Sequence, residues 1–115
     1  MTREIYKICP ERLWLEAEKA GRFDGAPIDL ADGYIHFSTV EQVRETAAKH
    51  FAGQTDLLLV AVATETLGTA LKWEVSRGAA LFPHLYATLD PAVVLWVKPL
   101  PTGADGSHIF PADLP

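Results

Sequence analysis

The chain has 115 residues, 49% of them hydrophobic and 22% charged, which are the proportions of an ordinary globular protein and predict a single domain spanning residues 1–115. Fifteen acidic against ten basic residues give a net charge of −5, and no two basic residues are adjacent, so we expect no nucleic-acid partner, which would need clustered phosphate-neutralising side chains. No apolar run approaches the roughly 20 residues of a membrane-spanning helix, so we expect no membrane partner either.

Two features predict a cytoplasmic location. The N-terminal stretch MTREIYKICPERLW is charged and interrupted by Pro10, unlike a secretory signal. Cys9 is the one cysteine of the sequence, which excludes an internal disulfide and fits a reducing compartment. The sequence leaves the oligomeric state open.

The first half of the chain alternates strands and helices. Pro10 suits a first helical turn, Gly21 suits a helix end, and Ser38 with Glu41 has the spacing of a capping box. The expected elements are a strand over residues 4–8, a helix from Pro10 to Ala20, a loop over residues 22–32 and a strand after Gly33. A second helix is expected to begin at Ser38 and to end at Gly53. Its apolar face would carry Val43, Ala47 and Phe51.

The second half predicts strands without helices. Residues 56–63 (DLLLVAVA) are apolar at successive positions, which is typical of a central strand buried on both faces. Strands are also expected over residues 71–75 and 93–97, and an extended segment over residues 81–86, where Pro83 favours a sheet edge or a loop. Helices followed by a β-rich half predict an α+β fold with a mainly antiparallel or mixed sheet, and a surface tail over residues 100–115.

The stretch DGYIHFST, residues 32–39, places polar side chains where a ligand site is expected. In a strand, Tyr34, His36 and Ser38 share one face, and the apolar Ile35 and Phe37 share the other. The N-terminus of the following helix would lie near this face and attract an anionic ligand. A structural interpretation stays open, in which Ser38 caps the helix and His36 is a satisfied or surface residue.

The stretch WEVSRGAALFPHLY, residues 73–86, gathers a second set of polar and aromatic residues. Arg77 suits an anion clamp, Phe82 and Tyr86 offer rings for stacking, and Glu74 and His84 suit hydrogen bonds to ribose hydroxyls. The alternative is a solvated charged face with an ordinary edge tyrosine. A metal site of His36, His84 and Glu74 lacks close ligand spacing, so no metal is expected.

Together these two stretches resemble domain-of-unknown-function family 952, which carries an Asp-Gly-aromatic-Ile-His motif and a later Trp-Glu-x-x-Arg-Gly stretch leading to Phe-Pro-His-Leu-Tyr. The resemblance implies a fold like that of the ADP-ribosyltransferases, a split, mainly antiparallel β sandwich with two helices in its N-terminal half and a cleft that binds NAD. It further implies that His36, followed by Ser38, holds the ribose on the nicotinamide side. In the active enzymes a later glutamate stabilises the oxocarbenium-like transition state. Glu74 is the nearby candidate for this role here, although the motif around it differs.

Two functions follow as expectations. The first is an NAD-binding ADP-ribosyltransferase-like enzyme with NAD as its substrate. Its expected catalytic residues are Glu74 and His36, and its expected NAD-binding residues are His36, Ser38, Arg77, Phe82, His84 and Tyr86. The alternative is a catalytically inactive small-molecule or nucleotide-binding module on the same fold. A domain that binds another protein and no small ligand is a third interpretation.

Overall fold

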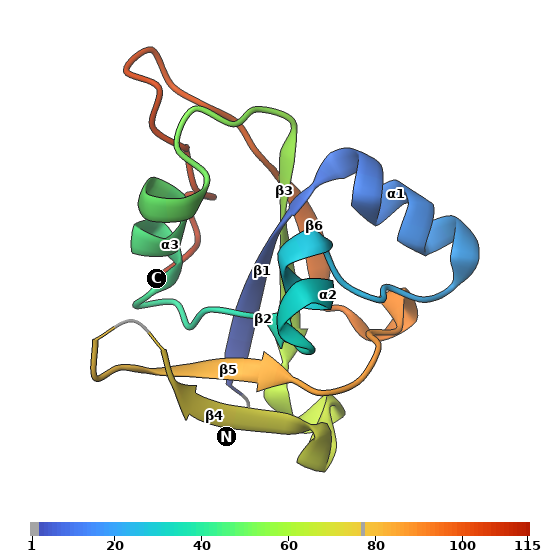
Figure 1. Cartoon of the computed structure of the whole chain (residues 1–115). Helices are drawn as coiled ribbons and strands as arrows, with labels where there is room; N and C mark the ends of the chain where they lie inside the picture. Colours follow the sequence, from blue (N-terminus) through green and yellow to red (C-terminus); the bar gives the residue numbers. More distant parts are fainter. Residues whose placement is uncertain (1–2, 77) are drawn as a thin grey trace.

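A computed structural model describes residues 3–76 and 78–115 (Figure 1). Its strands are β1 (Glu4–Pro10), β2 (Ile35–His36), β3 (Leu57–Ala63), β4 (Leu71–Val75), β5 (Leu81–Leu85) and β6 (Trp96–Leu100). Its α-helices are α1 (Glu11–Ala20), α2 (Pro27–Asp32) and α3 (Val43–His50). The strands form two antiparallel sheets, ordered β1-β3-β6 and β2-β5-β4. The expected α+β class is therefore confirmed.

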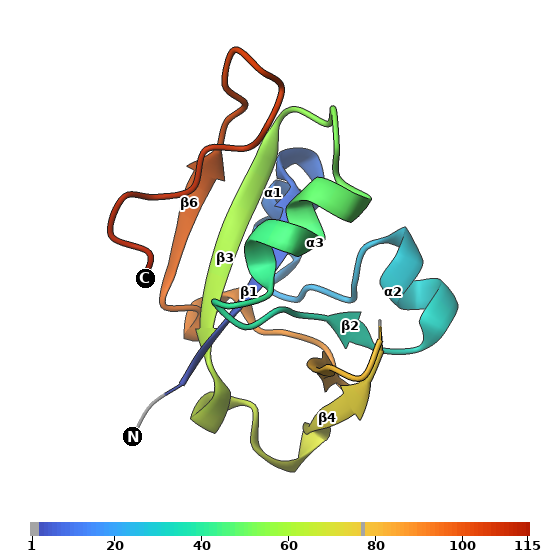
Figure 2. The same ribbon diagram turned by 90° about the vertical axis from the view of Figure 1, so that its left-hand side faces the viewer.

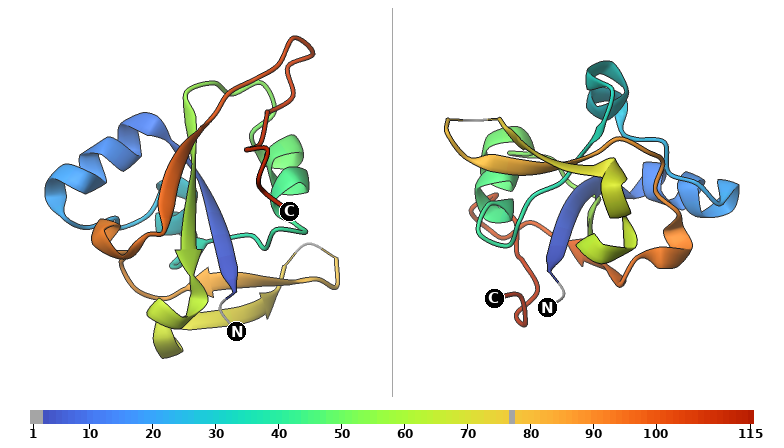
Figure 3. Two further views of the ribbon diagram at one scale, coloured as in Figure 1. Left: turned by 180° about the vertical axis from the view of Figure 1, so that it is seen from behind. Right: turned by 90° about the horizontal axis from the view of Figure 1, so that it is seen from below.

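The first sheet has β3 at its centre, as the continuous apolar run predicts. Val60 and Val62 belong to a core cluster shared with α1, whereas Leu59 and Ala61 belong to a cluster shared with α3. In Figure 3, α1 and α3 accordingly lie on opposite sides of this sheet. All four side chains are fully buried, so β3 contributes apolar contacts to both faces.

Helix α1 forms as its boundary residues predict. Pro10 precedes its first residue, and Gly21 ends it in the left-handed conformation, with φ of 75° and its backbone N–H donating to Ala17. Trp14 and Ala17 are its buried side chains. Cys9, near the end of β1, is buried in the same core cluster as Trp14, and this burial raises the pKa of its thiol to about 11. A thiol in that state is inert at neutral pH.

Residues 27–32, expected to be part of a loop, form the short helix α2. Pro27 occupies the first turn, where its missing N–H costs nothing. Gly33 ends the helix with φ of 88°, in the region that glycine favours. The six residues bury one side chain, that of Asp29. The expectation of a loop was wrong because a helix that buries a carboxylate has no apolar stripe to reveal it.

The helix expected from Ser38 begins five residues later, at Val43. Gln42 is its N-cap residue, so the predicted Ser38–Glu41 capping box does not form. Ser38 instead exchanges two backbone hydrogen bonds of 2.8 Å with Tyr6 of β1. Its hydroxyl lies 2.9 Å from Thr46 Oγ1 in α3. The segment after β2 therefore joins the first sheet, and the strand itself is two residues long.

The second sheet has β5 at its centre, although Pro83 favours an edge or a loop. Pro83 is accommodated beside the end of β2, where its carbonyl accepts a hydrogen bond of 3.0 Å from the Phe37 N–H. The last strand, β6, begins at Trp96 rather than residue 93, because Pro91–Val93 forms a 3-10 turn whose N-terminus is capped by Asp90. Figure 2 shows the chain after β6 turning back at the top of the view and running down past β6 to the C-terminus.

The C-terminal tail packs on the α3 side of the molecule. Leu114 is buried there, and the Arg44 guanidinium of α3 donates to the backbone carbonyls of Leu114 and Pro115 at 3.4 and 3.1 Å. Within the described residues, no helix has both the length and the apolar composition needed to cross a membrane.

Phe51 allows a test of how much the α3 cluster stabilises the fold. The side chain is only partly buried where α3 ends, so we expect Phe51→Ala to cost about 1–2 kcal/mol, less than the ~3–5 of a fully buried phenylalanine. Leu59→Ala, at a fully buried position, should cost ~2–5 kcal/mol. Urea unfolding measures both values. A larger loss for Phe51 than for Leu59 would contradict this description of the core.

Candidate functional site

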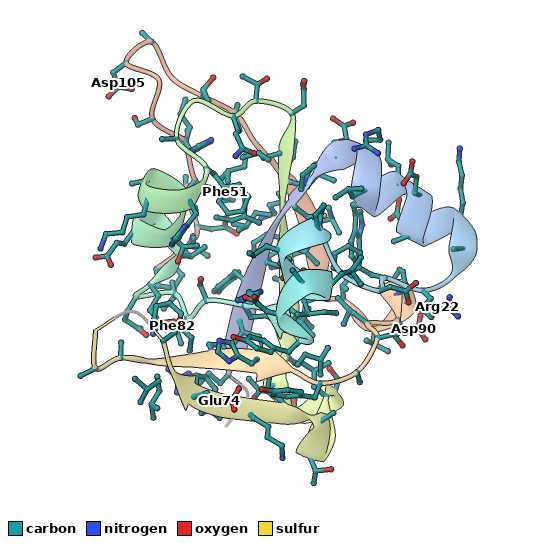
Figure 4. The ribbon with its side chains drawn as sticks, viewed as in Figure 1. Arg22, Phe51, Glu74, Phe82, Asp90 and Asp105 are labelled. Carbon is teal, nitrogen blue, oxygen red and sulfur yellow. The ribbon has the colours of Figure 1, made fainter. Side chains whose placement is uncertain are left out.

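Ionisable and aromatic side chains from both sheets meet beside α2. We call this group the His–Tyr cluster, and it consists of Lys7, Asp29, Asp32, Tyr34, His36, Glu74, His84 and Tyr86. The pairing of β2 with β5 sets His36 opposite His84 in register. Figure 4 shows Glu74 beside the paired strands β4 and β5. The two sequence motifs therefore converge through strand pairing.

The interior of the cluster is organised by Asp29. Its carboxylate lies 2.8 Å from Lys7 Nζ and 2.6 Å from His36 Nδ1. It also accepts the backbone N–H groups of Ala26 at 2.8 Å and His36 at 3.1 Å. Desolvation alone would raise the pKa of Asp29, but the His36 hydrogen bond and the Lys7 charge outweigh it and lower this pKa to about 2.

His36 lies between two carboxylates. Its Nδ1 faces Asp29 and its Nε2 lies 2.9 Å from Asp32 Oδ2. Ionised carboxylates only accept hydrogen bonds, so each ring nitrogen of His36 faces its carboxylate as the donor side of the contact. Lys7 and His36 are thus the side-chain partners of the two aspartates.

The outer part of the cluster is organised by Glu74. Its Oε1 accepts a hydrogen bond of 2.7 Å from the Tyr86 hydroxyl and one of 2.8 Å from His84 Nδ1. These two donors lower the pKa of Glu74, the Tyr86 bond contributing most. The Glu74 side chain is 40% exposed, whereas that of His84 is 3% exposed. The carboxylate is therefore held in its charged form at the surface by one exposed donor, Tyr86, and one buried donor, His84.

Tyr34 lies at the centre of the cluster. Its ring centroid is 4.1 Å from that of His84, 4.7 Å from that of His36 and 5.2 Å from that of Tyr86. Desolvation and the nearby charges of Asp32 and Glu74 raise the pKa of its hydroxyl. Four rings thus lie in contact at tilted angles, with His84 buried among them and two half-exposed carboxylates beside them.

The structure brings together His36, Glu74, His84 and Tyr86 of the residues predicted from the sequence. The Ser38 hydroxyl belongs to the α3 contact, and Phe82 is buried near the end of β5 that lies toward α3 in Figure 4. Arg77 lies outside the described residues.

Sequence reasoning missed three members of the cluster. Lys7 stands in an apolar strand, and Asp29 and Asp32 stand in a segment expected to be a loop. A lysine in the middle of EIYKI was the one available signal, because a buried ammonium group requires a carboxylate partner.

Four hollows, of about 650, 480, 440 and 420 Å³, are lined by residues outside the cluster. One of about 650 Å³ separates α3 from the tail, and one of about 440 Å³ lies between the start of β1 and the tail. Across residues 3–76 and 78–115, no three histidine, cysteine or acidic side chains are grouped as a metal site.

The Tyr86–Glu74 bond makes a prediction for tyrosine ionisation. Accepting the phenol hydrogen bond, the ionised Glu74 raises the pKa of Tyr86 to about 12. Because neutral glutamine lacks the charge, we expect Glu74→Gln to lower the Tyr86 pKa toward 10.0, its ordinary value. Absorbance of tyrosinate during an alkaline titration measures the change, and Tyr86→Phe identifies the signal. An unchanged titration would contradict the hydrogen bond.

The depressed pKa of Asp29 predicts how stability changes in acid. The folded-state value of about 2 lies below the ordinary value of 3.8, so this carboxylate stabilises the fold above pH 3.8 and loses that contribution as pH falls toward 2. The loss amounts to about 2 kcal/mol. Urea unfolding at a series of pH values measures it. Stability that stays constant over this interval would contradict the assignment.

Comparisons with known proteins place the chain in a family. A family model described as "Protein of unknown function (DUF952)" matches residues 8–97. The crystal structure of protein CC0527 from Caulobacter crescentus is 51% identical, with 92% of this chain and 93% of that chain covered and a TM-score of 0.89. The solution NMR structure of CC0527 is 52% identical, with 90% of each chain covered and a TM-score of 0.82. No curated protein matches. The chain belongs to the DUF952 family of proteins of unknown function.

Proposed function

We propose that the His–Tyr cluster binds NAD and that the protein transfers its ADP-ribosyl group, on a split β sandwich of the ADP-ribosyltransferase kind. The observation that carries the proposal is the Glu74 carboxylate, held by His84 and Tyr86, whose rings both contact the ring of Tyr34. A fixed, ionised carboxylate next to accessible aromatic rings suits a reaction in which positive charge moves from an aromatic ring to a sugar carbon.

The reaction breaks the bond between the ribose C1′ and the pyridinium nitrogen of NAD. The nitrogen keeps the bonding electron pair, so nicotinamide leaves as a neutral molecule and C1′ acquires oxocarbenium character. A nucleophile, water or an acceptor side chain, then supplies an electron pair to C1′ and loses its proton to solvent. Glu74 faces the charge that develops at C1′, and an interaction made mainly in the transition state raises the turnover rate.

The remaining members of the cluster hold the ligand. The partly exposed rings of Tyr34 and Tyr86 contact the pyridinium, whose charge the nearby Glu74 carboxylate favours. His36 donates to a ribose oxygen. Arg77 binds the pyrophosphate in this proposal, because a guanidinium can donate two hydrogen bonds to phosphate oxygens.

Incubation with NAD tests the enzymatic function. We expect the wild-type protein to release nicotinamide above the rate of the buffer blank, and Tyr86→Phe to slow this release because Glu74 loses one donor. Glu16→Gln, which removes an exposed carboxylate on α1, is the matched charge control and should behave as wild type. Binding without release would refute the transferase function.

A catalytically inactive binding module is the second candidate. It is favoured by the same two hydrogen bonds, because a carboxylate held in its ionised form by two donors is a weak proton acceptor for activating a nucleophile. In this case NAD or another nucleotide binds the cluster and leaves unchanged. Equilibrium binding together with the nicotinamide assay separates the two candidates.

A further inference from the structure

His36 is held by two carboxylates that differ in burial. Asp29, at Nδ1, has a side chain 1% exposed, whereas Asp32, at Nε2, has a side chain 42% exposed. The imidazole is therefore anchored from the interior through one nitrogen. Its other nitrogen faces the accessible side, where Asp32 is its partner.

Several hydrogen bonds hold Asp29, the buried partner of His36, in place. Besides the His36 ring, Asp29 binds the His36 backbone N–H and the buried Lys7 ammonium. Rotation of the imidazole would break a buried charged hydrogen bond, which is costly. Asp32 is the last residue of α2, and an exposed ion pair such as its contact with His36 adds little stability because water solvates both groups once they separate.

We infer that a ligand displaces Asp32 from His36 Nε2 and places an acceptor oxygen where the Asp32 carboxylate lies. Asp29 is the positioning residue, which keeps the Nε2–H directed at the site. This inference rests on the proposed function, since the ribose and pyrophosphate of NAD carry such oxygens. Asp32 then competes with every ligand and disfavours those without an acceptor oxygen at this point.

Two substitutions of Asp32 separate displacement from simple charge repulsion. Asp32→Asn keeps an acceptor oxygen without the charge, whereas Asp32→Ala removes both. We expect Asp32→Ala to bind NAD about two- to fivefold more tightly than wild type, the range that an exposed ion pair allows, and Asp32→Asn to gain less. Asp24→Ala, at a carboxylate paired with Arg22 on the surface, should leave the affinity unchanged. Equal gains in both Asp32 variants, or no gain, would overturn the inference.

The ring nitrogens of His36 test the positioning role of Asp29 without any ligand. In a proton–nitrogen NMR spectrum we expect the Nδ1–H of wild type to exchange slowly with water, and Asp29→Asn to lose this protection while remaining folded. Asp32→Ala should keep the Nδ1–H and speed exchange at Nε2–H alone. If Asp29→Asn fails to fold, the Asp32→Ala spectrum decides, since loss of its Nδ1–H signal would overturn the role of Asp29.

Inorganic phosphate distinguishes failure of the inference from failure of the proposed function. If NAD does not bind wild type or the Asp32 variants, NAD binding is refuted, and the acceptor-oxygen inference is then judged by phosphate alone. We expect phosphate to shift the His36 Nε2 signal at a lower concentration in Asp32→Ala than in wild type. No shift in either protein would overturn the inference.

Discussion

Replacing Asp29 with alanine is expected to destabilise the protein by ~3–5 kcal/mol, as is typical when one partner of a buried ion pair is removed. The Lys7 ammonium would remain buried without its counter-charge, and the backbone N–H groups of Ala26 and His36 would lose their acceptor. Urea unfolding measures the loss.

Two further variants show whether the ion pair causes that loss. Asp24→Ala removes an exposed carboxylate and should change stability by less than ~1 kcal/mol. Adding Lys7→Met to Asp29→Ala should restore part of the lost stability, because it removes the uncompensated charge but not the two unsatisfied N–H groups. A loss below about 1 kcal/mol for Asp29→Ala would contradict the central place of this carboxylate in the fold.

Glu74→Gln is expected to have the largest effect on activity. If the carboxylate stabilises the developing charge at C1′, its neutral isostere should lower the rate of nicotinamide release at least about 100-fold. NAD affinity should change far less, because the interaction forms mainly in the transition state. Stability should also change little, since the side chain is half-exposed and glutamine still accepts hydrogen bonds from His84 and Tyr86.

The measurement is nicotinamide release at saturating NAD, compared with Glu16→Gln as the matched loss of an exposed glutamate. An equal release rate in Glu74→Gln and wild type would remove Glu74 from the mechanism. A fall in NAD affinity that accounts for the whole effect would instead assign Glu74 to ligand binding.

Much of the fold follows from local patterns in the sequence. The run LLLVAVA is typical of a strand buried on both faces, and Pro10 with Gly21 marked the limits of α1. The starts of β6 and α3 were less predictable. A 3-10 turn occupies the residues expected to begin β6, and Ser38, expected to begin α3, forms a bridge with Tyr6 of β1. Such features depend on contacts between distant segments, which periodicity does not report.

The candidate site shows the same division. His36, Glu74, His84 and Tyr86 were identified from two motifs, and the register of β2 with β5 and of β5 with β4 brings them together. Alternation also assigned Ser38 to the face of His36, but β2 ends at His36 and the chain then pairs with β1, so alternation no longer applies.

Asp29 is the member of the site that depends most on tertiary structure. It pairs with Lys7 across 22 positions of the sequence, and it lies in a six-residue helix without an apolar stripe. Aspartate and lysine are seldom buried unless they are paired, so the burial of Asp29 could be predicted only if its contact with Lys7 were already known.

The central claim is that the side chains around Tyr34 form a ligand site, and NMR titration with NAD tests it most directly. At millimolar NAD, ring signals of Tyr34, His36 and Tyr86 should shift together along one binding curve. The signal of Trp14, a fully buried side chain of α1 outside the His–Tyr cluster, should stay in place. Unmoved signals of all three rings at that concentration would contradict the account.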